Sequence, residues 1–162
     1  MAVTITNPTT AQEVREQEQE IILTRFTCED AWQLGQLVYA LAKEKGAKIA
    51  SAIEKNGQIV FAVAFEGTKP DNDRFIAGKR LVVRQFHCSS LTMKLMLKER
   101  QKTPEEGLLL DAKQYSFLGG GVPISIKDVG VIGSLVVSGL PDDQDHALAV
   151  EAISALKDKF AI

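Results

Sequence analysis

Cysteine and histidine are scarce in this sequence, with two of each among 162 residues. Cys28 and Cys88 are too few for a disulfide framework, and they form no CxxC pair of the kind that zinc and redox sites use. His87 and Cys88 are adjacent, so they would point in different directions on a helix, and His146 is distant along the chain. No spacing of zinc ligands follows from these positions, and we predict no metal site.

Long apolar runs and an excess of basic charge are also absent. No run approaches the roughly 20 apolar residues that a membrane-spanning helix needs. The segment MAVTITNPTTAQEVREQEQE lacks the basic and apolar parts of a secretory signal. The formal net charge is −2, whereas a nucleic-acid-binding domain normally carries a basic stripe. We therefore expect a cytoplasmic protein with no membrane partner and no nucleic-acid partner.

What remains is the composition of a folded protein, with 45% apolar and 25% charged residues. The length fits about one domain, large enough to bury a core without disulfides or a structural metal. We assign residues 1–19 to a flexible arm and the start of an N-terminal helix, and residues 20–162 to a single domain. The helix predicted over residues 11–25 is polar for most of its length. We expect it to pack on a neighbour, which includes a second subunit.

Local signals divide the rest of the chain into helices and two hairpins. Thr27, followed by acidic residues, predicts the start of a helix. Asn56-Gly57 suits the type I′ turn of a first hairpin, and a Lys127-Asp128 turn divides a second β region. Pro141 and the aspartates after it begin a last helix. Two hairpins with flanking helices predict an α+β domain with a mainly antiparallel sheet.

The segment DNDRFIAGKRLVVRQFHCSS predicts a helix capped by Asp71 or Asp73 that continues to about Arg100. At about 100° per residue, a stripe roughly 60° wide on this helix is mostly polar and borders apolar residues that would face a core. The stripe consists of Asp73, Arg80, Arg84, His87 and Leu91. A polar stripe in this position differs from an ordinary solvated face.

Arg80 and Arg84 stand one turn apart on the stripe and can present two guanidinium groups to one anion. His87 adds a hydrogen-bond donor, an acid–base group or a metal ligand. Three interpretations stay open at this point. The stripe is an exposed charged face in which Asp73 pairs with a basic residue, a network at a subunit interface, or a ligand site.

A second unusual feature is the run LGGGVPI, in which Gly119, Gly120 and Gly121 let the backbone pass close to a ligand or another strand. Their N–H groups could also bind an anion, although the run is neither a phosphate loop nor GxGxxG. A tight bend with a bulge is the alternative. Further along, Asp145 and His146 fit helix capping better than an acid–base pair, and no serine has a base placed for a hydrolytic triad.

Two blocks of the sequence resemble a known family. The blocks are NGQIVFAVAFEGTKPDNDRFIAGKRLVVRQFHCSSLTMKL and GGGVPISIKDVGVIGSLVVSGLPDDQDHALAVEAI. They resemble the GlcG/HbpS-like family of haem-binding or haem-degrading domains, and the likeness covers about residues 20–160. The chain is most similar to a cytoplasmic branch with a pattern like PDND-W-xx-KR-xxVxRF-x-HSS. It departs from that pattern at Phe75, where the branch often has Trp, and at Cys88, which interrupts the His-Ser-Ser run.

The resemblance implies a profilin-like α+β domain, with a central antiparallel sheet of about five strands flanked by helices, that assembles into symmetric oligomers. For relatives it implies binding of tetrapyrroles, haem or corrinoid, sometimes with breakdown of haem. The positions that match are Asp71, Asn72, Asp73, Lys79, Arg80, Arg84, His87, Ser89, Ser90, Gly119 to Gly121, Ser138, Gly139, Asp145 and His146.

We therefore predict a homo-oligomer that binds a small anionic ligand, with haem or another tetrapyrrole as the named candidate. The predicted ligand-binding residues are Asp73, Arg80, Arg84, His87, Ser89, Ser90, Gly119, Gly120 and Gly121, and no catalytic residue is assigned. The two arginines suit the propionates of haem, and His87 suits its iron. Two alternatives remain: an enzyme acting on a small carboxylate or haem at the same site, and a non-catalytic scaffold with the basic stripe at a subunit interface.

Overall fold

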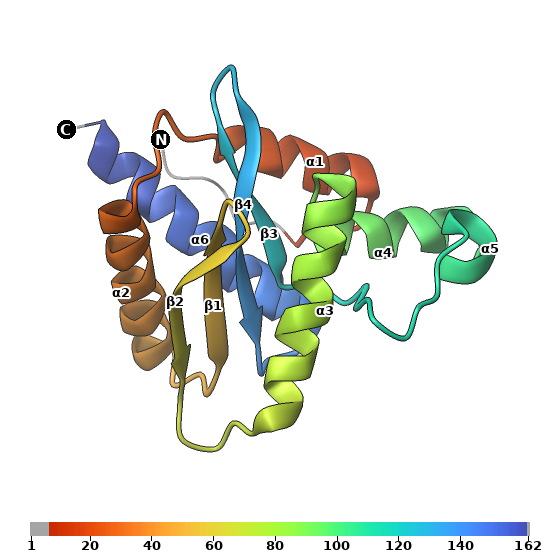
Figure 1. Ribbon diagram of the computed structural model, residues 1–162, viewed down its shortest axis with the longest axis horizontal. Helices are drawn as coiled ribbons and strands as arrows, with labels where there is room; N and C mark the ends of the chain where they lie inside the picture. The colour runs from red at the N-terminus through yellow and green to blue at the C-terminus, as the bar shows by residue number, and fades with distance from the viewer. Residues whose placement is uncertain (1–6, 162) are drawn as a thin grey trace.

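The computed structural model describes residues 7–161, so most of the predicted N-terminal arm lies outside the described residues. Two helices, a hairpin, three helices, a second hairpin and a last helix follow one another along the chain (Figure 1). They are α1 (Ala11–Glu20), α2 (Cys28–Glu44), β1 (Ala50–Lys55), β2 (Gln58–Ala64), α3 (Pro70–Phe86), α4 (Ser90–Glu99), α5 (Pro104–Leu108), β3 (Gly121–Ile126), β4 (Gly130–Ser138) and α6 (Asp142–Phe160).

The four strands form one antiparallel sheet in the order β2-β1-β4-β3. The α+β class is confirmed, but the prediction of about five strands is wrong within residues 7–161. The long apolar run after the Lys127-Asp128 turn forms the single strand β4, and the residues before Gly121 form a loop instead of a further strand. The sheet is therefore two hairpins joined through β1 and β4.

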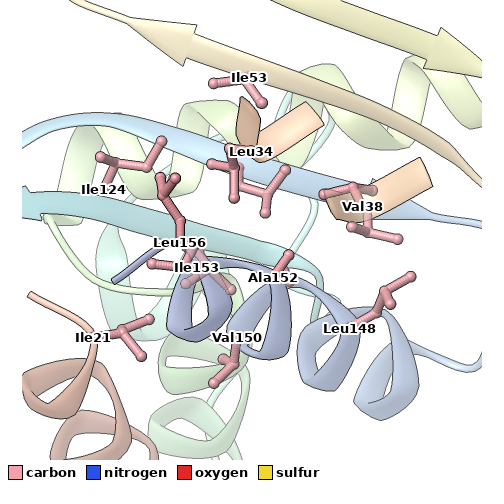
Figure 2. Packing of buried hydrophobic residues seen from close by; sticks show 14 of the residues in the cluster. Ile21, Leu34, Val38, Ile53, Ile124, Leu148, Val150, Ala152, Ile153 and Leu156 are labelled. Carbon is pink, nitrogen blue, oxygen red and sulfur yellow. The ribbon is translucent and has the colours of Figure 1, made fainter. Parts of the chain in front are cut away.

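Helices cover the two faces of the sheet unequally. The main core lies between α2, α6 and one face, and Figure 2 shows Leu34 and Val38 of α2 meeting Ile153 and Leu156 of α6 beside Ile53 of β1. Each such side chain, when fully buried, contributes about 1.5–3 kcal/mol. On the other face α3 packs on small residues of β1 and β4 (Figure 1). On this face no helix covers β2, whose opposite face contacts α2. The larger core therefore fixes the sheet, and the α3 face stays partly open.

Two local predictions are confirmed. Thr27 caps α2, because its hydroxyl accepts from the N–H of Asp30 at 3.1 Å and the Asp30 carboxylate accepts from the N–H of Thr27 at 2.8 Å. Asn56 and Gly57 have φ of 50° and 85°, the positive values that a type I′ turn requires.

The single helix predicted from Asp71 to about Arg100 is wrong, because the chain forms two helices there. His87 takes the left-handed conformation with φ of 53° and ends α3. Ser89 then caps α4, and its hydroxyl accepts from the N–H of Thr92 at 3.0 Å. The start of α3 also differs from the prediction. Lys69 occupies the N-cap position, and the side chain of Asn72, instead of that of an aspartate, accepts from the N–H of Lys69 at 3.0 Å.

The polar N-terminal helix packs within its own chain. Helix α1 ends at Glu20 instead of residue 25, and its Val14 is buried against Leu91 and Leu95 of α4. The N–H of Ala11 donates to the Glu99 carboxylate at 2.8 Å. The neighbour on which this helix packs is therefore α4.

Candidate functional site

An apolar groove lies on the open part of the sheet, between α3 and β2. Ala52, Ala62 and Ala64 line its floor together with Ile59 and Val63 of β2, and Ile76 and Ala77 of α3 form its wall. We call it the alanine groove and define it by Ala52, Ala62, Ala64, Ile76 and Ala77. Its volume is about 340 Å³, close to the lower end of small-molecule pockets.

A second cleft lies between the end of α3 and the two hairpins. We call it the hairpin cleft and define it by Asn56, Gly57, Arg84, His87 and Gly133; its volume is about 270 Å³. Gly133 is required here, since a Cβ at this position would lie 1.9 Å from the Glu54 carbonyl oxygen. Gly133 therefore allows β4 to pair closely with β1 at the edge of this cleft.

Glu54 lies between the two clefts and binds both arginines of the predicted stripe. Nη2 of Arg80 lies 2.9 Å from Oε1 of Glu54, and Nη2 of Arg84 binds the same oxygen. Burial alone would raise the pKa of Glu54, but hydrogen bonds from the arginines and their positive charges outweigh it and lower the pKa. The two arginines thus converge on one carboxylate, as their spacing predicts, but that carboxylate belongs to β1.

The arginine pair retains unused binding capacity. One carboxylate against two guanidinium groups leaves one positive charge, and the Arg84 side chain is 51% exposed. Nε of Arg80 and Oγ of Ser134 are buried without a hydrogen-bond partner within residues 7–161. Ser134 stands opposite Glu54 in the β1–β4 ladder, on the same face of the sheet. Buried polar atoms normally find partners, so these two are unsatisfied polar groups beside the cluster of Arg80, Arg84 and Glu54.

The structure places Asp73 and His87 at opposite ends of this region. Asp73 is exposed and borders the alanine groove, together with Arg80. His87 is exposed on the hairpin cleft together with Arg84. Since α3 ends at Phe86, His87 does not continue the helical stripe toward Leu91. The four stripe residues from Asp73 to His87 therefore serve two adjoining clefts instead of one continuous face.

The predicted serines and glycines lie at a different place, in the buried contact of α3, α4 and β3. The Ser90 hydroxyl accepts from the N–H of Gly121 at 2.9 Å, and the Asp142 carboxylate accepts from the N–H of Gly119 at 3.0 Å. Gly120 has φ of 130°, and a Cβ there would lie 2.3 Å from the Val137 carbonyl oxygen. The N–H groups of Gly119 and Gly121 are thus engaged inside the protein, which is the geometry of a tight bend.

A buried ion pair beside these glycines was not assigned by sequence reasoning. Nζ of Lys79 lies 3.2 Å from Oδ2 of Asp145, and both side chains are nearly inaccessible. Lys79 also donates to the Val137 carbonyl at 2.9 Å, while Asp145 accepts from the N–H of Leu140 at 2.9 Å. Burial raises the pKa of Asp145 to about 6, although Lys79 and the N–H donors lower it in part. The position of Asp145 near the helix start predicted a capping role, but Pro141 occupies the N-cap position, and Asp145 binds Lys79 and the N–H groups of Gly139 and Leu140 instead.

His146, next to this pair, is buried and neutral. Its Nε2 lies 2.7 Å from Oε1 of Gln17 in α1, and burial lowers its pKa to about 4. It faces neither cleft, which agrees with a structural role and not an acid–base one.

Within the described residues the chain has neither a cluster of hard metal ligands nor a membrane-spanning helix. Among residues 7–161, no three His, Cys, Asp or Glu side chains come together as ligands for a metal ion. Within that range, none of the helices combines the length and the apolar character needed to cross a bilayer.

Comparison with known proteins places this geometry in a family. The family described as haem degrading protein HbpS-like matches residues 26–154. A UPF0303 protein of Streptomyces coelicolor is 42% identical over 153 residues, which cover 94% of this chain and 96% of the relative. The crystal structure of Ybr137w has a TM-score of 0.85 at 33% identity, covering 93% of this chain and 90% of that one.

More distant structures share the fold alone. A crystal structure of a PduOC:heme complex has a TM-score of 0.67 at 18% identity, over 82% of this chain and 95% of that chain. The likeness to structures of this kind confirms the profilin-like α+β fold, with four strands in the sheet. Because the family match spans most of the chain and the relatives cover nearly all of it, the chain belongs to the HbpS-like family, as its two sequence blocks predict.

Proposed function

We propose that this protein binds an anionic small molecule, with haem or another tetrapyrrole as the leading candidate, against Arg80 and Arg84. The observation that carries the proposal is the arginine pair itself, which has one uncompensated positive charge and the unpartnered Nε of Arg80 between two clefts. The family is one of haem-related proteins, and a structural relative was solved as a haem complex. Both points support the proposal.

The residues present fit such a ligand. Guanidinium groups bind carboxylates well, so Arg80 and Arg84 would hold the propionates in competition with Glu54. The alanine groove offers an apolar surface beside Arg80 for part of the ring. His87 is exposed and carries an imidazole suited to the iron, while haem itself would supply the redox chemistry of that iron. Of the other predicted residues, Asp73 borders the groove, whereas the serines and glycines would support the site from beneath α3.

A haemin titration followed by absorption spectroscopy tests this proposal. We expect a saturable shift of the Soret band with the wild type. His87→Ala should weaken the shift, and Arg84→Ala should weaken binding by roughly 10- to 100-fold, because a hydrogen bond between charged groups contributes about 1.5–3 kcal/mol.

Arg74→Ala is the matched control for the arginine variant. Arg74 lies on the same helix but is exposed and paired with Asp71, away from both clefts. Haemin affinity of this variant should equal that of the wild type. A response that does not saturate, or an equal loss in Arg74→Ala and Arg84→Ala, would contradict the proposal.

A second candidate function uses the same site for catalysis. His87 and Arg84 border the same cleft, so a small carboxylate held by Arg84 would lie beside an imidazole able to act as acid or base. This version requires His87→Ala to abolish turnover while leaving ligand affinity nearly unchanged. Loss of affinity in that variant would favour simple binding.

We also propose that the protein is a homo-oligomer that assembles through β2 and α2. Strand β2 is an edge strand without charged side chains, and its outer backbone groups are available for pairing. Trp32 and Tyr39 of α2 stand beside this edge, packed on Phe61 and Phe65, and remain 53% and 43% exposed. Large aromatic side chains exposed together are typical of a subunit contact.

Light scattering tests the assembly. The wild type should give a mass that is a multiple of 17.7 kDa, and Trp32→Arg should shift it toward the single chain. Val129→Arg is the control, because Val129 is more exposed and lies at the β3–β4 turn. A wild-type mass of 17.7 kDa across a wide concentration range would refute the assembly. Dissociation by Arg80→Ala with Arg84→Ala would instead place the subunit contact at the basic stripe.

A further inference from the structure

A third cavity lies where α1 passes the corner between α3 and α4, and it collects most of the sulfur in the chain. Figure 1 shows α1 lying alongside α4 at this corner. The cavity has a volume of about 390 Å³ and is bordered by His87, Cys88, Met93 and Met96, with the oppositely charged Arg15 and Glu18 of α1 at its side. We call it the sulfur cavity and define it by the first four of these residues.

The break between α3 and α4 brings these side chains together. On one continuous helix, His87 and Cys88 would point about 100° apart. Because His87 is left-handed and the helix ends before it, both residues instead border the same cavity. Met93 and Met96 are three residues apart on α4 and therefore share a face. Adjacent residues such as His87 and Cys88 cannot bind one metal ion on a straight helix, but at the break between α3 and α4 they can.

The surroundings of the sulfur atoms keep out water. Cys88 and Met93 are 9% and 3% exposed, and Phe86, Tyr115 and Phe117 pack against them. His87 is exposed and Met96 is half-buried, so the cavity has an opening at these residues. The other cysteine, Cys28, is exposed at the start of α2 and does not border the cavity.

The donor atoms are a thiol, two thioethers and an imidazole, which is a soft set. Thioethers and thiolates select monovalent copper, whereas zinc and harder ions favour carboxylates, histidines and cysteines in groups. No three of those harder donors meet within residues 7–161, so this cavity has no competing ligand set for zinc. The types of donor that border the cavity therefore favour a soft ion over zinc.

We propose that His87, Cys88, Met93 and Met96 bind a monovalent soft metal ion, Cu(I), in the sulfur cavity. This site shares His87 with the proposed tetrapyrrole site, because His87 borders both the hairpin cleft and the sulfur cavity, whereas its other three ligands take no part in that function. Binding forms a bond between copper and Sγ of Cys88 and breaks the S–H bond, and the proton leaves to solvent. Copper stays monovalent, so no oxidant or reductant is needed.

Competition for Cu(I) with bicinchoninate under anaerobic, reducing conditions tests the site in the full chain. The absorbance of the copper–bicinchoninate complex reports how much copper the protein withdraws. We expect about one ion per wild-type chain, and a loss of affinity of roughly 10- to 100-fold or more in Cys88→Ser and in Met93→Leu with Met96→Leu. Exchange of Met for Leu conserves volume, so the methionine variant should stay folded.

Cys28→Ser is the matched control and should bind copper like the wild type. The proposal is overturned if the wild type withdraws no copper, if Cys28→Ser loses as much affinity as Cys88→Ser, or if the methionine variant binds as well as the wild type. Haemin titration of Cys88→Ser separates the two proposals: an unchanged Soret response with lost copper binding supports a site distinct from the tetrapyrrole site. A folded Cys88→Ser variant that keeps copper would refute the ligand set.

Discussion

Replacing Lys79 with methionine should lower the free energy of unfolding by about 3–5 kcal/mol, the usual loss when one partner of a buried ion pair is removed. The reason is the partner that remains. Asp145 is 3% exposed, and within residues 7–161 Lys79 is the cation that pairs with it and lowers its pKa. Without Lys79 the carboxyl must either keep an unpaired buried charge or take up a proton, and both cost stability. Methionine fills much of the volume of the lysine stem, and the loss therefore reports charge more than packing. Urea unfolding of the variant and the wild type measures it.

Lys94→Met is the control, because Lys94 forms a more exposed ion pair with Asp142 at 2.7 Å. Exposed pairs contribute about 0–1 kcal/mol, so this variant should remain near the wild type. Adding Asp145→Asn to Lys79→Met should recover part of the loss, since the uncompensated charge is then gone and an amide oxygen still accepts from Leu140. Equal stability of the two lysine variants would contradict the interpretation.

This ion pair matters for the site because it holds α3 in place. Lys79 joins α3 to the end of β4 and to the start of α6 through Val137 and Asp145. The next residue of the same helix, Arg80, joins α3 to β1 through Glu54. The two arginines are thus positioned by a helix that is attached to the sheet by charged contacts on both sides, above a floor of small side chains.

The sequence predicted those parts of the fold that depend on neighbouring residues. The cap at Thr27 and the turn at Asn56-Gly57 depend on residues that lie within three positions of one another. The corner at His87 was missed because helix-forming residues continue on both sides of it. Ser89 was the signal, since a serine inside a helical pattern favours a cap.

The sequence predicted the arginine pair but not its partner. A spacing of four residues correctly placed Arg80 and Arg84 against one carboxylate. That the carboxylate is Glu54, and that Lys79 finds Asp145, depends on contacts between residues that are 26 to 66 positions apart. A single sequence contains no local signal for such pairs, because folding of the whole sheet brings them together.

Acid should destabilise the protein through His146 between about pH 6.5 and pH 4. In the unfolded chain this histidine has its usual pKa of 6.5, whereas burial lowers the pKa to about 4 in the folded protein. Above pH 6.5 both states carry a neutral imidazole, so its contribution to stability is fully present. As the pH falls below 6.5 the unfolded state takes up a proton that the folded state refuses, and stability is lost until pH 4.

The expected loss from this one residue is about 3 kcal/mol, from the difference between the two pKa values. Other buried acids, among them Asp145 with a pKa of about 6, titrate in the same range, so the wild-type profile alone does not isolate it. The variant His146→Gln isolates the contribution of His146, because glutamine keeps a polar contact to Gln17 but does not titrate. The difference in unfolding free energy between variant and wild type should therefore move by about 3 kcal/mol in favour of the variant between pH 7 and pH 4. If that difference stayed constant with pH, His146 would have to be accessible to protons in the folded state, and the contact of α1 with α6 through Gln17 would have to open readily.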